Sequence, residues 1–343
     1  MNGCTRPRRS VVLLALASVL FGCTSPRDRT PQVRELYART ALRTARNPVV
    51  VIHGILGARL EQRSTGRTVW GAFTSEAVDP NSPDGARALA LPLSVPEALH
   101  ALPREVADVV ATGPLRAIQL GIVFTVINVG VYVDILRSLG VGGYRDRIVL
   151  DPSSPEYAED HFTCETFFYD WRRDNVENAM AFGQYLDATR RGIQARAQGR
   201  IDKLRSEGGE AAEQEAAELE QWLADGFRFD VVAHSMGGLM ARYFLRYGAQ
   251  DLPADGSLPK VTWAGAEWID RMVLVGTPNL GAMESLQTLI EGFSPGLFLP
   301  HFDAAVLGTM PSIYQLLPRG GQGLVVDEDG KQLDVDPRDP ALW

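Results

Sequence analysis

The sequence predicts an α/β fold with a mostly parallel, doubly wound sheet, and three observations support this prediction. Residues 49–52 form a continuous β-branched run, which is typical of a parallel strand buried on both faces. Residues 229–233 form a second apolar run, which ends in a turn of small residues and leads directly into a helical pattern. Residues 271–275 form a third run that ends at a glycine. Strands interleaved with helical segments in this way indicate a parallel sheet.

Length and composition fit one large α/β domain or two small ones. The chain has 343 residues, of which 45% are hydrophobic and 22% are charged, so it contains enough apolar surface for a sizeable core. The formal net charge is −8, and no basic patch suggests a nucleic-acid partner. We predict no metal ligand set and no cofactor, because no histidines, cysteines and acids are spaced for metal binding.

The N-terminal stretch is interpreted as a targeting signal and a tether. Three arginines among the first nine residues precede an apolar segment, residues 11–21, which is too short to span a bilayer stably. Residues 20–23 are Leu-Phe-Gly-Cys, which resembles the lipobox of bacterial lipoproteins. We therefore expect removal of residues 1–22, acylation of Cys23, and a tether over residues 23–46 at a membrane surface of the bacterial cell envelope, periplasmic or outer-membrane. The alternative is an ordinary secretory signal and a secreted protein.

The three cysteines predict no intramolecular disulfide in the mature chain. Cys4 lies in the predicted signal, and Cys23 would carry the lipid. Cys164 is then left without a partner. We predict that it is a buried structural thiol at the start of a strand.

A candidate nucleophile lies at the apex of the turn after residues 229–233. Ser235 is followed closely by Gly237 and Gly238, which are small enough for a strained turn, and Ala233 stands where a glycine is usual. Strand, sharp turn and helix form the nucleophile elbow of an α/β-hydrolase. We therefore predict that Ser235 attacks an ester and becomes acylated.

A second motif predicts where the oxyanion would bind. The strand at residues 49–52 ends in a glycine-containing turn, residues 53–57. In α/β-hydrolases one oxyanion N–H group comes from such a loop, and the other comes from the residue after the nucleophile. We therefore predict an oxyanion hole formed by the backbone N–H groups of Ile55 and Met236, where the loss of one donor typically costs about 10² to 10³ in rate.

Two further regions are predicted to cover the site, and a third to extend from the domain. Residues 62–163 form one predicted cap segment, with a helix near residues 132–139, and residues 282–325 form the other. Ordinary core packing is the alternative for the apolar parts of both segments. Residues 175–224 have a helical pattern broken by two glycines, and charges four residues apart predict a solvated helix pair.

One charged pair follows the strand predicted at residues 165–169. Asp170 and Arg172 lie where such folds place their chemistry, at the C-terminal edge of the sheet. They would either contact the substrate or form a local ion pair that orders the loop. We favour the ion pair.

Several segments occur in the order of a known family. They are residues 47–61 with Trp70, and residues 168–172, 233–238, 276–281 and 311–318. Together they resemble the lecithin:cholesterol acyltransferase-like family of α/β-hydrolases over roughly residues 47–320. The resemblance implies an α/β-hydrolase domain at residues 47–343 and a lipid-ester substrate of the phospholipid kind. An acyl-serine intermediate would give hydrolysis with water and O-acyl transfer with an alcohol.

Two other functions are left open by the sequence. A general carboxylesterase or a triacylglycerol lipase would use the same chemistry on other esters. A hydrolase-fold lipoprotein without a complete catalytic triad would bind a partner or a lipid without turning it over.

The catalytic acid and base are not evident in the sequence. In α/β-hydrolases the order is serine, acid, histidine, and His301 is the one histidine after Ser235. Residues 299–303 contain no strand-end loop or glycine turn that would bring His301 to the sheet edge. In the resembling family, the acid and the base come later, on loops after further strands. We therefore expect a C-terminally incomplete domain that ends before the triad closes, with His301 as an unorthodox base as the alternative.

Overall fold

A computed structural model describes most of the chain from residue 45 onward. The described residues are 45–73, 77–92, 108–115, 117–120, 125–128, 135, 139, 164–255, 257–295, 300–320 and 325–342. The predicted signal peptide, Cys4, Cys23 and nearly all of the tether lie outside these residues, and so does most of the predicted cap segment between residues 93 and 163. In the described part, no helix combines the length and the hydropathy that a membrane span requires.

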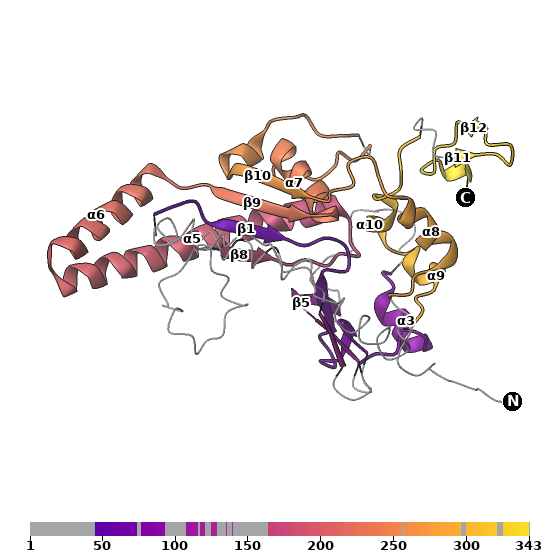
Figure 1. Cartoon of the computed structure of the whole chain (residues 1–343), viewed down its shortest axis with the longest axis horizontal. Helices are drawn as coiled ribbons and strands as arrows, with labels where there is room; N and C mark the ends of the chain where they lie inside the picture. The colour runs from indigo at the N-terminus through magenta and orange to yellow at the C-terminus, as the bar shows by residue number, and fades with distance from the viewer. Residues whose placement is uncertain are drawn as a thin grey trace, which may run out of the picture.

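A four-stranded parallel sheet forms the centre of the fold (Figure 1). Its order is β10 (Ile269–Val275), β9 (Phe229–His234), β1 (Val49–Ile52) and β8 (Cys164–Phe167). All three strand pairings are parallel, and β1 pairs with both β8 and β9. The predicted α/β class with a mostly parallel sheet is therefore confirmed.

The two faces of the sheet bury different side chains. Successive residues of a strand point to opposite faces. Val50 and Ile52 belong to the main core with residues of α5 (Asn175–Glu207) and α7 (Met236–Tyr247). Val49, Val51 and Cys164 form a second cluster, which Ile135 and Leu139 cover. These two covering residues are helical, as predicted, so helices lie on both faces of the sheet.

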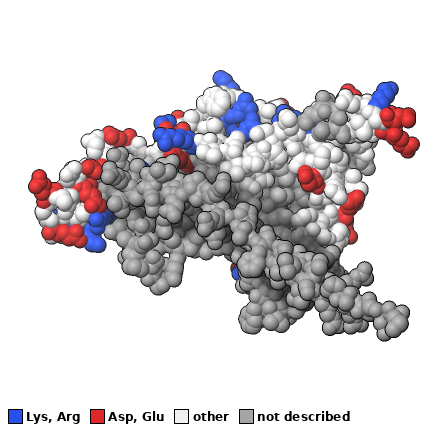
Figure 2. Space-filling view, viewed as in Figure 1, with Lys and Arg blue, Asp and Glu red and all other residues white. Residues whose placement is uncertain are grey.

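Helix α5 continues into a long hairpin with α6 (Glu210–Asp225), which projects away from the sheet in Figure 1. Gly208 and Gly209 separate the helices with φ of 69° and 98°, a left-handed backbone that favours glycine. The two helices are joined by ion pairs of Arg200 with Glu215 and of Arg205 with Glu220. Charged side chains cover this end in Figure 2, so the predicted solvated helix pair is confirmed.

A smaller β region begins directly after the loop that follows β1. In it, β2 (Ala58–Gln62) pairs antiparallel with β3 (Thr68–Trp70) and β5 (Val109–Pro114). A second small sheet contains β4 (Ala72–Phe73), β6 (Ala117–Leu120) and β7 (Thr125–Asn128), and α3 spans Pro83–Leu89. These elements lie below the carboxyl end of the central sheet in Figure 1. Part of the predicted cap segment is therefore β structure.

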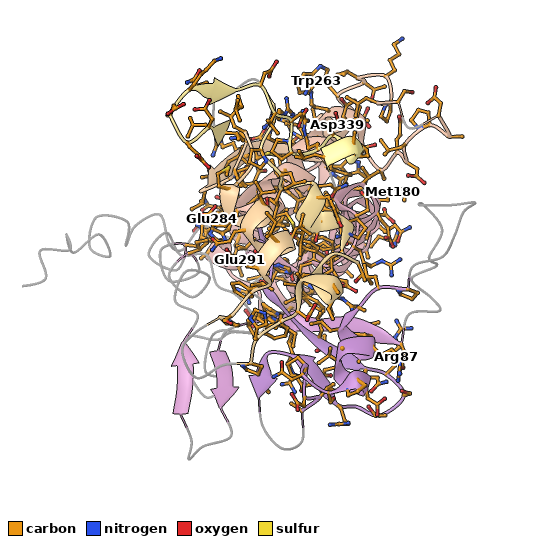
Figure 3. All side chains as sticks on the ribbon, turned by 90° about the vertical axis from the view of Figure 1, so that its right-hand side faces the viewer. Arg87, Met180, Trp263, Glu284, Glu291 and Asp339 are labelled. Carbon is orange, nitrogen blue, oxygen red and sulfur yellow. The ribbon has the colours of Figure 1, made fainter. Side chains whose placement is uncertain are left out.

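The chain after β10 forms short elements on one side of the sheet, which face the viewer in Figure 3. They are α8 (Met283–Glu291), α9 (Ala304–Leu307), α10 (Pro311–Tyr314), β11 (Val325–Val326), β12 (Gln332–Leu333) and η3 (Pro340–Leu342). One further short helix, η2 (Ala264–Glu267), lies before β10 in the sequence. Phe302 forms a β-bridge with Phe293 and packs 5.3 Å from the ring of Trp70. This contact connects the predicted second cap segment to the main core.

Strand β10 is the edge of the central sheet in the described part of the chain. Its adjacent residues Val273 and Leu274 point to opposite faces and are 54% and 36% exposed. Parallel strands are normally covered on both faces, as all four residues of β1 are here. The sheet therefore presents an open apolar edge beside β9.

Candidate active site

Ser235 lies at the sharp turn between β9 and α7 and is partly exposed. Its backbone has φ of 52° and ψ of −127°, a conformation that non-glycine residues rarely adopt. The serine N–H donates to the Val275 carbonyl at 2.8 Å, and its own carbonyl accepts from Gly238 at 3.0 Å. Backbone strain of this kind persists only where the surroundings enforce it, and it is concentrated at functional sites.

The glycines around Ser235 are required by close backbone approaches. A Cβ atom on Gly237 would lie 2.3 Å from the His53 carbonyl oxygen, and one on Gly238 would lie 2.0 Å from the Thr277 hydroxyl. A Cβ atom on Gly54 would lie 2.7 Å from the Cβ of Ser235. The loop after β1 and the loop after β10 therefore pack directly against the serine turn.

The loop after β1 is held in a defined conformation. Gly57 donates its N–H to the Gly54 carbonyl at 3.2 Å, and Leu56 between them has a positive φ of 63°. The indole N–H of Trp70 donates to the Leu56 carbonyl at 2.9 Å. Ile55, a predicted oxyanion donor, thus lies in a fixed turn whose first residue touches Ser235.

The second predicted donor, Met236, is the first residue of α7, where backbone N–H groups have no partner inside the helix. Among the described residues, no hydrogen bond uses the N–H group of Ile55 or of Met236. Both groups are therefore free to bind a ligand oxygen.

His53 connects this loop to the end of β8. Its Nε2 accepts the N–H of Tyr169 at 3.1 Å, so its Nδ1 carries the proton and donates to the Gly54 carbonyl at 2.7 Å. The Tyr169 hydroxyl donates to the His53 carbonyl at 2.9 Å, and the two rings stack at 4.3 Å. Burial lowers the pKa of His53 from 6.5 to about 4, so the ring is neutral near pH 7.

The pKa of His53 predicts a loss of stability in acid. In the unfolded chain His53 takes up a proton below about pH 6.5, whereas in the folded chain it takes up this proton only near pH 4. The free energy of unfolding should therefore fall by up to about 3 kcal/mol from this residue as the pH drops from 6.5 to 4. Urea unfolding against pH should show a shallower fall in His53→Gln than in the wild type.

A matched control for this measurement is His301→Gln, because His301 is exposed. It should keep the pH dependence of the wild type. An NMR titration of the wild-type His53 ring gives a second readout, in case His53→Gln does not fold. A ring that titrates near its ordinary pKa of 6.5 would contradict the prediction.

Asp170 and Arg172 form a buried, two-point ion pair. The Arg172 guanidinium donates to the Asp170 carboxylate from Nε at 2.9 Å and from Nη2 at 2.7 Å. It also donates to the carbonyls of Ala88 and Leu89 at 3.2 and 2.9 Å, and to that of Val109 at 3.3 Å. All five donors of the guanidinium are used, so none is left for a substrate. The interpretation as an ion pair that orders the loop is confirmed.

The other histidines have different surroundings. His234 is half-buried at the end of β9, and burial lowers its pKa. The Nδ1 atom of His301 lies 3.0 Å from the hydroxyl of Ser294, on an exposed segment. Among the described residues, no hydrogen bond joins an imidazole or a carboxylate to the Ser235 hydroxyl. Cys164 is buried and free, as predicted.

Comparison with known proteins gives a family match that includes the serine turn. Residues 217–332 match the lecithin:cholesterol acyltransferase family. The match confirms the resemblance that the sequence motifs indicated, and it includes Ser235 and the loop after β10. The loop after β1 lies outside the matched segment.

A search of solved structures found similarity to the Tle4-Tli4 complex, with a TM-score of 0.42 and 16% sequence identity. The alignment covers 86% of this chain and 61% of the chain in that structure. The present chain thus spans about three fifths of that chain's length. No curated protein matches the sequence.

Sequence reasoning missed the residues that hold the loops next to Ser235 in place. These are the stacked pair His53 and Tyr169, and the indole of Trp171, which donates to the Ala58 carbonyl at 3.1 Å. The available signal was the position of these residues, because His53 follows one predicted strand and Tyr169 is the last residue of another. Only the pairing of Ile52 with Phe167 shows that these strand ends are neighbours.

Proposed function

We propose that this protein is a serine-dependent acylhydrolase or O-acyltransferase of phospholipid-like lipid esters. Ser235 is the nucleophile, and the N–H groups of Ile55 and Met236 form the oxyanion hole. The observation that carries the proposal is the strained backbone of Ser235, φ 52°, at a strand-to-helix turn in contact with Gly54. Free backbone N–H groups beside a partly exposed serine are the arrangement that acyl transfer needs.

The reaction proceeds in two halves. The Ser235 Oγ attacks the ester carbonyl carbon while its proton passes to a base, and the resulting oxyanion binds the two N–H groups. The bond to the leaving alcohol then breaks, and the alcohol takes up the proton. Water or a second alcohol attacks the acyl-serine in the same way and releases the acid or the new ester.

Exposed apolar side chains on the loop after β10 and on α8 support a lipid substrate. Leu280, Met283 and Ile290 are 62%, 42% and 63% exposed, on the loop after β10 and on α8. Large apolar residues grouped on a surface commonly mark a contact with an apolar ligand. Acyl chains that lie along α8 would cover them.

Substrate profiling tests this function against a general carboxylesterase or lipase. The full chain is assayed with a phospholipid, a triacylglycerol and a short p-nitrophenyl ester, with and without an alcohol acceptor. Preference for the phospholipid supports the proposal. Preference for the short ester or the triacylglycerol would replace it with the carboxylesterase or lipase assignment.

A second candidate is a hydrolase-fold lipoprotein that binds lipid without turnover. The surroundings of Ser235 favour it, because both ring nitrogens of His53 are already hydrogen-bonded within the loop. A fluorophosphonate probe distinguishes the candidates, since a serine that fails to react would favour a binding role.

We further propose that Cys23 is acylated and anchors the protein in the bacterial cell envelope. The support is the lipobox-like segment before Cys23. More than one acyl chain would hold the protein stably at a membrane surface. Cys23→Ser should therefore move the protein from the membrane fraction to the soluble fraction, as measured by fractionation and immunoblotting. A wild-type protein that is soluble and unlipidated would contradict this prediction.

A further inference from the structure

We propose that a cavity beside the first turn of α7 binds the phosphate group of the ester that Ser235 attacks. This inference rests on the function proposed above. The cavity has a volume of about 360 Å³. Its lining includes Leu239 and Tyr314, whose hydroxyl already donates to the Gly308 carbonyl at 3.0 Å, together with four further residues that carry side-chain donor groups. These four are Asn279, Gln315, Arg319 and Arg338.

The cavity lies close to the nucleophile. Leu239 lies in the first turn of α7, and Ser235 is the N-cap of this helix, so the cavity begins about one helical turn from the nucleophile. On its other side the cavity is lined by Asn279, in the loop whose Thr277 packs against Gly238. The chain just after α10 lies beside the same loop, because the Ala282 N–H donates to the Leu316 carbonyl at 2.8 Å.

The polar lining presents donors to the cavity. The Asn279 side-chain oxygen accepts from Arg242, and the Gln315 side-chain oxygen accepts from the Asn175 N–H at 2.9 Å. The side-chain amide nitrogens of Asn279 and Gln315 are the groups left to donate. Both amides therefore favour an anionic or carbonyl ligand over a cation.

Arg319 makes the cavity electropositive, and Arg338 adds an unused donor group. Arg338 uses Nε and Nη2 for the Asp336 carboxylate, at 2.9 and 2.7 Å, which leaves its Nη1 unused. Hydrogen bonds from Arg338 lower the pKa of Asp336 to about 2, so this pair is neutral overall near pH 7. The Arg319 side chain has no ion pair in the described part of the structure, so its charge is not compensated. A guanidinium with free donors suits a phosphate oxygen.

Buried polar atoms without partners lie at the same junction. They are both side-chain polar atoms of Asn175 and the hydroxyls of Thr277 and Ser312, four of the eight such atoms in the described residues. The Asn175 N–H binds Gln315, and Ser312 precedes Gln315 by one helical turn. Native proteins leave few buried polar groups unpaired. These atoms indicate that water or a polar ligand group belongs beside the cavity.

A phospholipid fits this arrangement because its glycerol backbone places the phosphate a few bonds from the ester. The ester carbonyl would lie at Ser235 while the phosphate reaches the donors one helical turn away. The exposed Leu280 and Met283 continue from the cavity lining at Gly281 toward α8 and would contact the acyl chains.

Binding measurements on the full chain with Ser235→Ala test the subsite without requiring turnover. The probes are dihexanoyl phosphatidate below its micelle concentration, dihexanoylglycerol and inorganic phosphate. The phosphatidate should bind at least about tenfold more tightly than the uncharged diester, because charge-assisted hydrogen bonds are gained. The double variant Arg319→Gln, Arg338→Gln should lose most of this preference.

Arg87→Gln is the matched control, since Arg87 is also an exposed arginine paired with an aspartate, on α3. It should keep the preference for phosphatidate. Equal affinity for the two diesters, or a preference that survives the double variant, would overturn the subsite. Inorganic phosphate that binds as tightly as phosphatidate would overturn its assignment to the lipid ester. If the wild-type protein fails to react with the fluorophosphonate while the Ser235→Ala protein still prefers phosphatidate, the proposed function is overturned but the subsite is not.

Discussion

Ser235→Ala should abolish covalent labelling by a fluorophosphonate probe and all ester turnover that passes through an acyl-serine. The expected loss is complete for labelling, because the variant has no oxygen to form the bond. The turn itself should survive. Gly54 packs against the Ser235 side chain, because a Cβ atom on Gly54 would lie 2.7 Å from the serine Cβ and 3.2 Å from its Oγ. Alanine is smaller than serine, so the substitution adds no clash. Labelling is measured by intact mass, and the fold by circular dichroism.

Ser294→Ala is the matched control for this change. Ser294 also lies beside a histidine, with its hydroxyl 3.0 Å from His301 Nδ1, but it is exposed and not in a strained turn. It should leave the labelling unchanged. A probe that still labels the Ser235→Ala protein and fails on Ser294→Ala would move the nucleophile to Ser294.

The elements that could be predicted from the sequence are those that depend on local chemistry. The β-branched run of β1 is buried at every position, and two glycines with positive φ separate α5 from α6 where the helical pattern breaks. The serine turn was predictable for the same reason, because a residue held at φ 52° requires small neighbours. Each of these signals lies within a few residues of sequence.

The parts that could not be predicted depend on contacts between distant segments. The contact of His53 with Tyr169 joins residues 116 positions apart, and it exists only because β1 pairs with β8. Arg172 is satisfied by carbonyls of α3 and β5, which no pattern around Arg172 reveals. The strands β4, β6 and β7 are only two to four residues long, too short for a periodicity to identify.

Residues 23–343 alone should hydrolyse esters only about 10³- to 10⁴-fold faster than the uncatalysed reaction in water. This is the acceleration that an oxyanion hole and substrate binding supply without a base. His301→Ala should leave this rate unchanged. His301 binds Ser294 through Nδ1, and its Nε2 would lie 2.6 Å from a Cβ on Gly292, so the ring packs against its own exposed segment. His53 cannot replace it, because its pKa is about 4 and both of its nitrogens are hydrogen-bonded in the loop.

The measurement compares ester hydrolysis by residues 23–343 with that of His301→Ala and Ser235→Ala. Triad members act as a unit. Removal of the serine hydroxyl therefore lowers the turnover rate little in an enzyme that already lacks its base, but by about 10⁶-fold in an enzyme with a complete triad. A small effect of Ser235→Ala on turnover, together with complete loss of labelling, therefore identifies a nucleophile that lacks its base. Enzyme-like turnover that disappears in His301→Ala would show instead that His301 reaches Ser235 and completes the site within these residues.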